Sequence, residues 1–274
     1  MKLKGIIYDL AGTLCDRYSL SPVLSLIEAF KQDNISITMK EARMFMGLDK
    51  RVHITKTLEL PHIKAQCMNN NIHNPNVIYD HYKKVQIDTL ITDAVDGAVY
   101  ATNVVKRLGL KNGVTTGYST DVSSVVLESL RKQNVIIDNL VSSDEVKFGR
   151  PYPYMIFRCL ENMEIENPNT VIKIGDTIAD IHEGLNAGCW TVGVSKWSNE
   201  MNFESLDQAE NATNDEILRR TEHAKNILHH AGADFVIDDL TTINKLVTKI
   251  DNMMDDGLNP TIYRVLRQRD HFSY

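Results

Sequence analysis

The chain has 274 residues, of which 24% are charged and 43% hydrophobic, as in an ordinary globular protein with a full core. Acidic residues outnumber basic ones by 36 to 30 and no dense Lys/Arg run occurs, which argues against a nucleic-acid partner. No apolar stretch approaches the roughly 18 residues that span a bilayer, the four cysteines form no C-x-x-C pair, and no signal peptide is expected before the first strand, so we expect a cytoplasmic protein with reduced thiols.

The first predicted element is an apolar strand at residues 4–8 that ends in an acidic residue and a glycine turn. The turn reads Asp9-Leu10-Ala11-Gly12-Thr13. A carboxylate at the C-terminal tip of such a strand is well placed to act on a ligand in the crevice above a sheet. An Asp-x-x-Gly-Thr segment by itself is more often an ordinary turn, so a catalytic role for Asp9 requires evidence from other residues of the chain.

Residues 17–93 show no β-type alternation and are predicted to form a helical cap domain inserted after the first strand. Helices are expected at residues 21–33, 38–47, 48–60 and 76–94, the second opened by a capping box. Lys50 and His53 lie three residues apart and face the same side of the third helix. Taken alone, Lys50 resembles a surface lysine and His53 a packing histidine.

After the insert, strands and helices alternate. The predicted strands lie at residues 112–116, 140–141, 170–174, 190–194 and 235–237, and the helices between and after them end near residues 108, 133, 163, 187, 230 and 254. This alternation predicts an α/β fold with a doubly wound, parallel, Rossmann-like sheet. The core domain is assigned to residues 1–16 and 94–254, and the polar tail at residues 255–274 is left unassigned, either loose or docked on the core.

Several chemically useful residues follow the predicted strands or open the helices after them. Thr116 offers a hydroxyl beside a helix N-terminus that suits an anion, and Arg150 offers forked donors for phosphoryl oxygens. Asp9 and Asp176 offer hard oxygen ligands for Mg²⁺, while Asp180 is expected to brace the loop. Each could instead be a turn, a solvated side chain or an N-cap. Because the carboxyl ends of parallel strands meet in one crevice, the set in this order predicts phosphoryl transfer.

The motifs together resemble the phosphonoacetaldehyde hydrolases, a family of haloacid dehalogenase-like hydrolases. The matching segments are residues 9–13, 46–50 with His53, 116–118, 149–153, 173–177, 183–194 and 232–233. The resemblance covers roughly residues 3–250. Its most specific parts are Ala11 and Lys50, because ordinary phosphatases of the larger family place a second Asp two residues after the nucleophile and share no such cap lysine.

The resemblance implies that the chain hydrolyses the carbon–phosphorus bond of phosphonoacetaldehyde to acetaldehyde and phosphate, and that it forms a homodimer through the cap. Asp9 would be the nucleophile, Lys50 the Schiff-base residue and His53 a proton shuttle. The remaining implied roles are Mg²⁺ held by Asp9, the main-chain carbonyl of Ala11 and Asp176; substrate contacts from Gly12, Met46, Thr116, Gly117, Tyr118 and Arg150; and support from Asp180.

The chemistry of carbon–phosphorus cleavage explains why Ala11 and Lys50 occur together. A carbon–phosphorus bond would break to a carbanion, which protonation by an aspartic acid hardly helps, whereas an iminium formed on Lys50 accepts the bonding electrons. Lys50 must be neutral to attack, although an ordinary lysine is only about 0.04% neutral at pH 7. We expect a closed cap, with Arg51 and the metal as nearby positive charges, to lower its pKa, and Asp49 to face outward.

Three departures from the family pattern leave the fine substrate preference open. Leu10 stands where the family often has Trp, Ser19 stands where Cys can occur, and Arg51 adds a charge beside the lysine.

Two other functions remain possible on the sequence alone. The first is a phosphomonoesterase or phosphomutase acting on a small phosphorylated metabolite, against which Ala11 argues. The second is a non-catalytic member that binds a phosphorylated metabolite, against which the joint presence of Asp9, Lys50, Arg150 and Asp176 argues, because a binding module has no use for a nucleophile.

Overall fold

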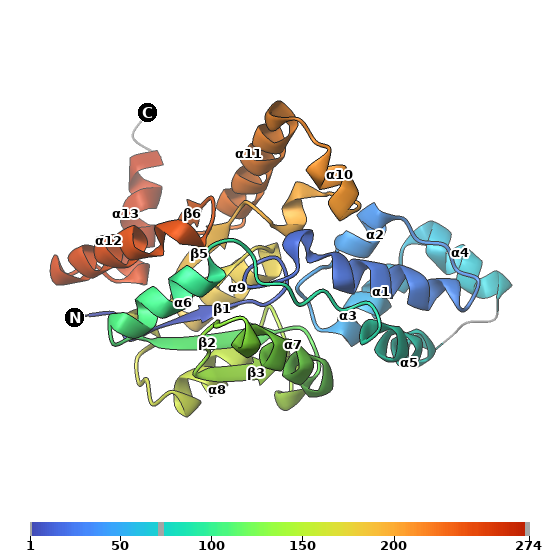
Figure 1. Cartoon of the computed structure of the whole chain (residues 1–274), viewed down its shortest axis with the longest axis horizontal. Helices are drawn as coiled ribbons and strands as arrows, with labels where there is room; N and C mark the ends of the chain where they lie inside the picture. Colours follow the sequence, from blue (N-terminus) through green and yellow to red (C-terminus); the bar gives the residue numbers. More distant parts are fainter. Residues whose placement is uncertain (1, 71–73, 272–274) are drawn as a thin grey trace.

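A wholly parallel sheet forms the centre of the computed structural model, which describes residues 2–70 and 74–271 (Figure 1). Its order is β3-β2-β1-β4-β5-β6, made by β1 (Gly5–Tyr8), β2 (Lys111–Thr116), β3 (Asn139–Ser142), β4 (Val171–Gly175), β5 (Trp190–Val194) and β6 (Phe235–Ile237). The order reverses between β1 and β4, which creates a crevice above their carboxyl ends. The predicted doubly wound α/β fold is confirmed.

Helices cover both faces of the sheet. They are α6 (Ala98–Arg107), α7 (Thr120–Lys132), α8 (Tyr154–Asn162), α9 (Ile178–Ala187), α10 (Leu206–Glu210), α11 (Asn214–His230), α12 (Ile243–Asp255) and α13 (Pro260–His271). The main hydrophobic cluster packs α6, α7 and α12 on one face, and smaller clusters pack α8, α9 and α11 on the other. None of the helices in the described ranges has the length and apolar character needed to cross a membrane.

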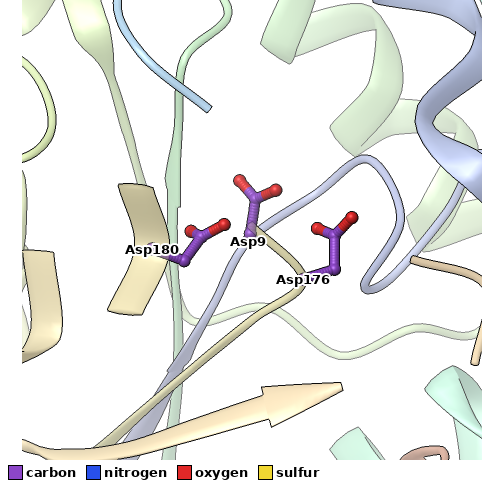
Figure 2. Close-up of side chains that lie close together, drawn as sticks. All are labelled: Asp9, Asp176 and Asp180. Atoms are coloured by element: carbon purple, nitrogen blue, oxygen red, sulfur yellow. The ribbon is translucent and has the colours of Figure 1, made fainter. Parts of the chain in front are cut away.

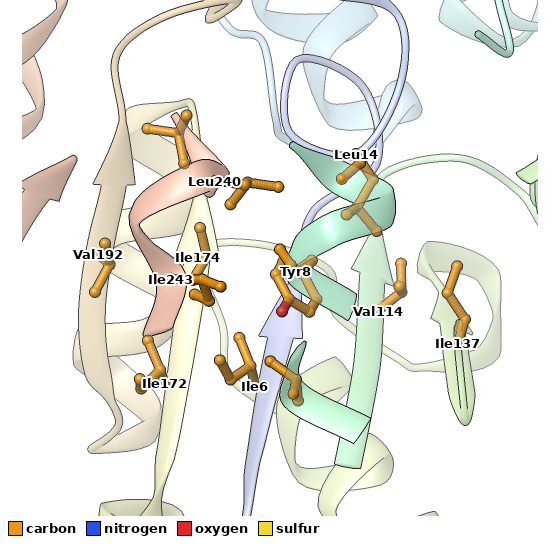
Figure 3. Close-up of a cluster of buried hydrophobic side chains, with 14 of the residues drawn as sticks. Ile6, Tyr8, Leu14, Val114, Ile137, Ile172, Ile174, Val192, Leu240 and Ile243 are labelled. Atoms are coloured by element: carbon orange, nitrogen blue, oxygen red, sulfur yellow. The ribbon is translucent and has the colours of Figure 1, made fainter. Parts of the chain in front are cut away.

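Strand β1 is buried on both faces, which fixes the position of the residue that follows it. Ile6 and Tyr8 point into the cluster under α6 and α12, where Val114 and Ile174 flank Tyr8 (Figure 3). Ile7 belongs to the cluster on the opposite face. Because side chains alternate along a strand, a slip of one residue would exchange these faces. Asp9 therefore emerges at a fixed place above the carboxyl end of the sheet.

Five helices between β1 and β2 form a separate group, which we call the helical insert. They are α1 (Leu20–Lys31), α2 (Met39–Arg43), α3 (Lys50–Leu58), α4 (Pro61–Asn69) and α5 (Pro75–Gln86). They pack around their own hydrophobic cluster, with Leu26, Phe30 and Ile54 among its buried members. Figure 1 shows the insert at the end of the molecule toward which β1 runs. The assignment of residues 17–93 to a cap domain stays a prediction.

Two features of the insert differ from the helices expected from sequence. Helix α4 begins with Pro61 in its first turn, where a missing N–H costs nothing, and no helix is predicted there from sequence. It extends to Asn69, into the start of an Asn-rich loop predicted at residues 68–75, of which residues 71–73 lie outside the described ranges. Helix α5 ends at Gln86, so the helix predicted to residue 94 is too long. The chain beyond it leaves the helical path because Ile91 N donates to Ser21 Oγ at 2.6 Å and Asp93 accepts from Asp16 N at 3.2 Å.

The C-terminal tail docks on the core through α13. Arg264 donates from Nε to Asp234 Oδ1 at 2.8 Å and from Nη2 to Asp234 Oδ2 at 2.6 Å and the Cys189 carbonyl at 2.5 Å. The ring of Tyr263 stacks on Phe235 with centroids 5.4 Å apart. Of the two arrangements predicted for the tail, loose or docked on the core, the docked one is observed over α13.

The Arg264→Ala variant is expected to lower the free energy of unfolding by about 2–3 kcal/mol, because it leaves the carboxylate of Asp234 buried without its cation. Chemical denaturation at pH 7 measures this change. Arg107→Ala, at an exposed position of α6, serves as the control. Equal stability of the two variants would show that the pair of Arg264 with Asp234 contributes no net stability.

Candidate active site

Three carboxylates meet above the crevice in the sheet. Asp9 follows β1, Asp176 follows β4, and Asp180 lies in the first turn of α9. Figure 2 shows the three side chains gathered there, and one ligand oxygen from each lies within 4.8 Å of the others. All three are buried. The strand ends predicted to converge therefore do so, and Asp9 and Asp176 lie as the prediction requires.

The turn after β1 brings this cluster together through a glycine. Gly12 has φ +79°, and a Cβ at this position would lie 2.2 Å from Asp176 Oδ2. Only glycine combines that backbone conformation with so close an approach. Next to it, Thr13 Oγ1 donates to Asp176 Oδ1 at 3.2 Å. Gly12 thus lets Asp176 approach the turn closely, and its contact with substrate stays a prediction.

Arg150 is bound within the acidic cluster. Its Nη2 lies 2.7 Å from Asp9 Oδ1, its Nη1 lies 3.0 Å from Asp180 Oδ1, and its Nε lies 3.0 Å from Glu183 Oε2. Lys173, fully buried in β4, lies 3.0 Å from Asp180 and 3.1 Å from Glu183. In this structure Arg150 orients Asp9, and its predicted contact with phosphonyl oxygens stays a prediction.

Lys173 and Glu183 belong to this cluster but are not predicted as site residues from the sequence, although both lie in segments that match the family. A signal was present: Lys173 interrupts the apolar sequence Val-Ile-Lys-Ile-Gly. A lysine in a strand buried on both faces needs an acidic partner. Sequence alone does not identify that partner.

The charges of the cluster do not balance. Four carboxylates (Asp9, Asp176, Asp180, Glu183) face two cations (Arg150, Lys173), which leaves two excess negative charges. Burial, followed by repulsion from Asp9 and Asp180, raises the pKa of Asp176 well above its ordinary value. Burial also raises the pKa of Asp9, more than Arg150 lowers it. For Asp180 the attraction of Arg150 and Lys173 outweighs burial and lowers the pKa.

This imbalance fits a divalent cation. Asp176 makes no ion pair with any residue in the described ranges, and its hard oxygen atoms adjoin those of Asp9. Mg²⁺ is bound in proteins through one or two carboxylates together with other oxygens. Asp180, already neutralised and accepting from Thr177 Oγ1 at 2.6 Å, has the contacts of a bracing residue.

Lys50 opens helix α3 and is buried, with only 6% of its surface exposed. Its Nζ lies 3.5 Å from Met46 Sδ and 6.0 Å from the ring centre of Tyr82. Burial lowers the pKa of Lys50 from 10.5 to about 8, with the charges of Asp9 and Asp49 acting in the opposite direction. The expectation of a desolvated lysine with a depressed pKa is therefore met in the structure.

The neighbours of Lys50 are arranged partly as expected. Asp49 caps its own helix, accepting from Arg51 N at 3.0 Å and Val52 N at 3.2 Å. The expected influence of Arg51 is wrong, because its exposed guanidinium lies 2.5 Å from Asn76 and stacks 4.1 Å from the ring centre of Tyr79. The arginine whose charge helps to lower the pKa of Lys50 is Arg150.

His53 lies one turn after Lys50 and is completely buried. Burial, followed by the charge of Lys50, lowers its pKa well below 6.5, so the ring is neutral at pH 7. Neither ring nitrogen has a hydrogen-bond partner of ordinary geometry among the described residues. A neutral imidazole can both donate and accept a proton, but His53 is not among the residues that line the small cavity between the insert and the core, and its role as a shuttle stays a prediction.

A small cavity lies between the insert and the core. Its volume is about 20 Å³, and it is lined by Asp9, Ala11, Ser19, Pro22, Met46, Gly47, Lys50, Thr116, Gly117, Tyr118, Arg150 and Thr177. It therefore unites the predicted nucleophile, the predicted amine and every predicted substrate contact except Gly12. Such a volume holds about one water molecule. Outside it, a groove of about 790 Å³ along α3, α5 and residues 143–152 shares the lining residue Arg150.

Two contacts to Asp176 come from residues outside the expected site. Ser19 Oγ donates to Asp176 Oδ2 at 3.3 Å, so one of the three departures from the family pattern touches the carboxylate cluster. Asn199 N donates to the same oxygen at 2.7 Å. The segment at residues 195–212 carries neither regular periodicity nor a recognised motif, and a main-chain donor leaves no signal in a sequence. Leu10, another departure, is buried in the main hydrophobic cluster.

Comparisons with known proteins agree with this geometry. Residues 6–194 match the family described as haloacid dehalogenase-like hydrolase. A phosphonoacetaldehyde hydrolase of Bacteroides fragilis is 32% identical over 93% of this chain and 99% of its own length. A bifunctional phosphonoacetaldehyde hydrolase/aminoethylphosphonate transaminase of Clostridioides difficile is 33% identical over 92% of this chain, which spans 40% of that relative. The crystal structure of a phosphonoacetaldehyde hydrolase-like protein from Oleispira antarctica superposes with a TM-score of 0.90, at 30% identity, over 95% of this chain and 96% of the other.

Proposed function

Because this chain belongs to the phosphonoacetaldehyde hydrolases of the haloacid dehalogenase-like hydrolase family, we propose that it cleaves the carbon–phosphorus bond of phosphonoacetaldehyde, giving acetaldehyde and phosphate. One observation supports this reaction above the alternatives. Lys50, with a pKa lowered to about 8, lines a narrow cavity together with Asp9 and with Ala11, which stands where ordinary phosphatases have an acid. This arrangement suits imine formation and not the protonation of an alkoxide.

The first chemical step is the attack of the neutral Lys50 amine on the aldehyde carbon. A carbon–nitrogen bond forms, water leaves, and a protonated imine results. The proton transfers that this step needs are assigned to His53, whose ring is neutral at pH 7. The burial that lowers the pKa of Lys50 supplies the free amine, and the small cavity leaves room for about one water molecule beside it.

The second step is the attack of Asp9 on phosphorus. The carbon–phosphorus bond breaks and its electron pair moves into the iminium, which becomes a neutral enamine while the phosphoryl group is bound to Asp9. Arg150 holds Oδ1 of Asp9 and so orients the carboxylate for attack. Water then hydrolyses the aspartyl phosphate, and protonation of the enamine followed by imine hydrolysis releases acetaldehyde and free Lys50.

Mg²⁺ is the proposed cofactor. Asp9, Asp176 and the main-chain carbonyl of Ala11 would hold it, and it would supply the positive charge that offsets the repulsion between Asp9 and the anionic phosphonyl group. Thr116, Gly117 and Arg150 are proposed to bind the phosphonyl oxygens from the other side of the cavity. We also propose a cytoplasmic homodimer formed through the helical insert, where Leu24, Met44 and other apolar side chains are exposed.

The test is an assay with phosphonoacetaldehyde and Mg²⁺ that follows acetaldehyde and inorganic phosphate separately. Sodium borohydride added during turnover is expected to leave an N-ethyl group on the peptide that contains Lys50. Folded protein that releases neither product but cleaves para-nitrophenyl phosphate would instead support the phosphomonoesterase alternative. Binding of a phosphorylated metabolite without turnover, unchanged in Asp9→Ala, would support the non-catalytic alternative.

The pH dependence follows from the depressed pKa of Lys50. Only the neutral amine attacks the aldehyde, so kcat/KM is expected to rise about tenfold per pH unit below pH 8 and to level off above it, where the amine is mostly neutral. Initial rates between pH 6 and 9 at subsaturating substrate measure this profile. A profile that keeps rising steeply to pH 10 would mean that the amine has the pKa of an exposed lysine.

A further inference from the structure

Arg43, the last residue of α2, is a cation of the helical insert whose side chain is buried against the core. Only 6% of its surface is exposed. Its Nη1 donates to the Tyr18 carbonyl and to Asn199 Oδ1, each at 2.7 Å, and its Nη2 donates to the Phe203 carbonyl at 2.6 Å. One guanidinium therefore joins the insert, the segment that leads into the insert, and a loop of the core.

The segment contacted at Tyr18 is strained. Asp16, Tyr18 and Ser19 have φ values of 52°, 67° and 52°, in the left-handed region that side chains other than glycine rarely adopt. Asp16 holds the start of α1 by accepting from Leu20 N and Ser21 N, each at 3.0 Å. A backbone of this kind persists only where its surroundings hold it, and Arg43 supplies one of those contacts.

Both segments that Arg43 holds also touch Asp176. Ser19, next to Tyr18, donates from Oγ to Asp176 Oδ2 at 3.3 Å, and Asn199 donates from its main-chain nitrogen to the same oxygen at 2.7 Å. Arg43 reaches neither Asp176 nor the cavity itself. Its contacts thus converge on Asp176 by two routes, one through the entry to the insert and one through the core loop.

We propose that Arg43 is a positioning residue that couples the seating of the helical insert on the core to the placement of Asp176. The inference rests on the proposed function only in assigning Asp176 to the catalytic centre. When the insert lies on the core, Arg43 fixes Tyr18 and Asn199, and Ser19 Oγ and Asn199 N then hold one oxygen of Asp176. When the insert lifts, Arg43 leaves with it and Asp176 loses that support.

A matched control for this proposal is Arg220 in α11. Arg220 donates to the main-chain carbonyls of Met201 and Asn202, at 2.8 and 2.9 Å, and stacks on Phe203. It holds the same core loop as Arg43 but lies on a helix of the core. Arg43→Gln removes the link between insert and core, whereas Arg220→Gln loosens the loop alone.

The readouts are the affinity for Mg²⁺, measured by calorimetric titration without substrate, and tryptophan emission. Arg43→Gln is expected to weaken Mg²⁺ binding about threefold or more. This is less than the roughly 10–100-fold lost with a direct partner of a metal ligand, because Arg43 acts on Asp176 through other residues. Arg220→Gln is expected to weaken Mg²⁺ binding less than about twofold. Trp197 packs against Tyr18 with ring centroids 5.8 Å apart, while Trp190, the other tryptophan, is buried in the core. The emission of Arg43→Gln should therefore shift to longer wavelength.

Unchanged Mg²⁺ affinity in Arg43→Gln, or equal losses in Arg43→Gln and Arg220→Gln, would overturn the proposal. Should Arg43→Gln not fold, Arg43→Lys replaces it: lysine keeps the charge but lacks the planar fork, so a weakened affinity for Mg²⁺ is again expected. Neither readout requires turnover. Failure of the wild type to cleave phosphonoacetaldehyde would therefore reject the proposed function and leave this test valid.

Discussion

The Lys50→Met variant is expected to lose at least about 10⁴-fold in the rate of acetaldehyde release from phosphonoacetaldehyde, because no other group in the cavity can form an imine. Methionine matches the shape of the lysine stem and carries no buried ammonium, so the melting temperature should be unchanged or higher. Acetaldehyde assays, borohydride trapping followed by peptide mass analysis, and thermal unfolding measure these three expectations.

Lys56→Met is the matched control, since Lys56 lies exposed on the same helix with its Nζ 5.6 Å from the ring centre of Phe45. It should keep both turnover and the borohydride adduct at Lys50. Full activity in Lys50→Met would show that the bond breaks without covalent capture of the aldehyde and would remove the basis of the mechanism.

The Asp9→Asn variant should separate the two halves of the reaction. Asparagine keeps the shape of the side chain and can still bind Arg150, but it cannot take up the phosphoryl group, so phosphate release should fall about 10⁴-fold or more. Imine formation on Lys50 does not need this carboxylate. Borohydride should therefore trap an adduct on Lys50 that still contains phosphorus, in contrast to the N-ethyl adduct of the wild type.

Mass analysis of the trapped peptide distinguishes the two adducts directly. Asp88→Asn, at an exposed position just after α5, controls for the loss of a carboxylate. An N-ethyl adduct in Asp9→Asn would show that the carbon–phosphorus bond still breaks, which would assign the attack on phosphorus to another group or to water.

The parts of the fold that sequence predicts well are those encoded locally. Apolar runs such as that of β1, bounded by turn residues, locate the strands, and their alternation with helices predicts a parallel sheet. Parallel strands in turn place Asp9, Thr116 and Asp176 at one edge, so the outline of the site follows from the fold. The position of Lys50 inside the cavity came from the resemblance, because the residue alone looked like a surface lysine.

The parts that sequence did not predict depend on contacts between distant segments. The sequence identifies Arg150 as a useful cation, but its partner Glu183 lies on α9, 33 residues away along the chain, and no local pattern pairs the two. Asn199 acts on Asp176 through a main-chain N–H, which every residue except proline possesses. The end of α5 was overestimated because Ile91 is fixed by a hydrogen bond to Ser21 and not by helix propensity.

The volume between insert and core also bears on the timing of the reaction. A cavity of about 20 Å³ has room for about one water molecule and is too small for an organic phosphonate. For the proposed reaction we therefore expect α1–α5 to move away from the sheet and back during each catalytic cycle. Where that movement is slower than bond cleavage, it limits the turnover rate. A more viscous medium then slows the enzyme although the chemical steps are unchanged.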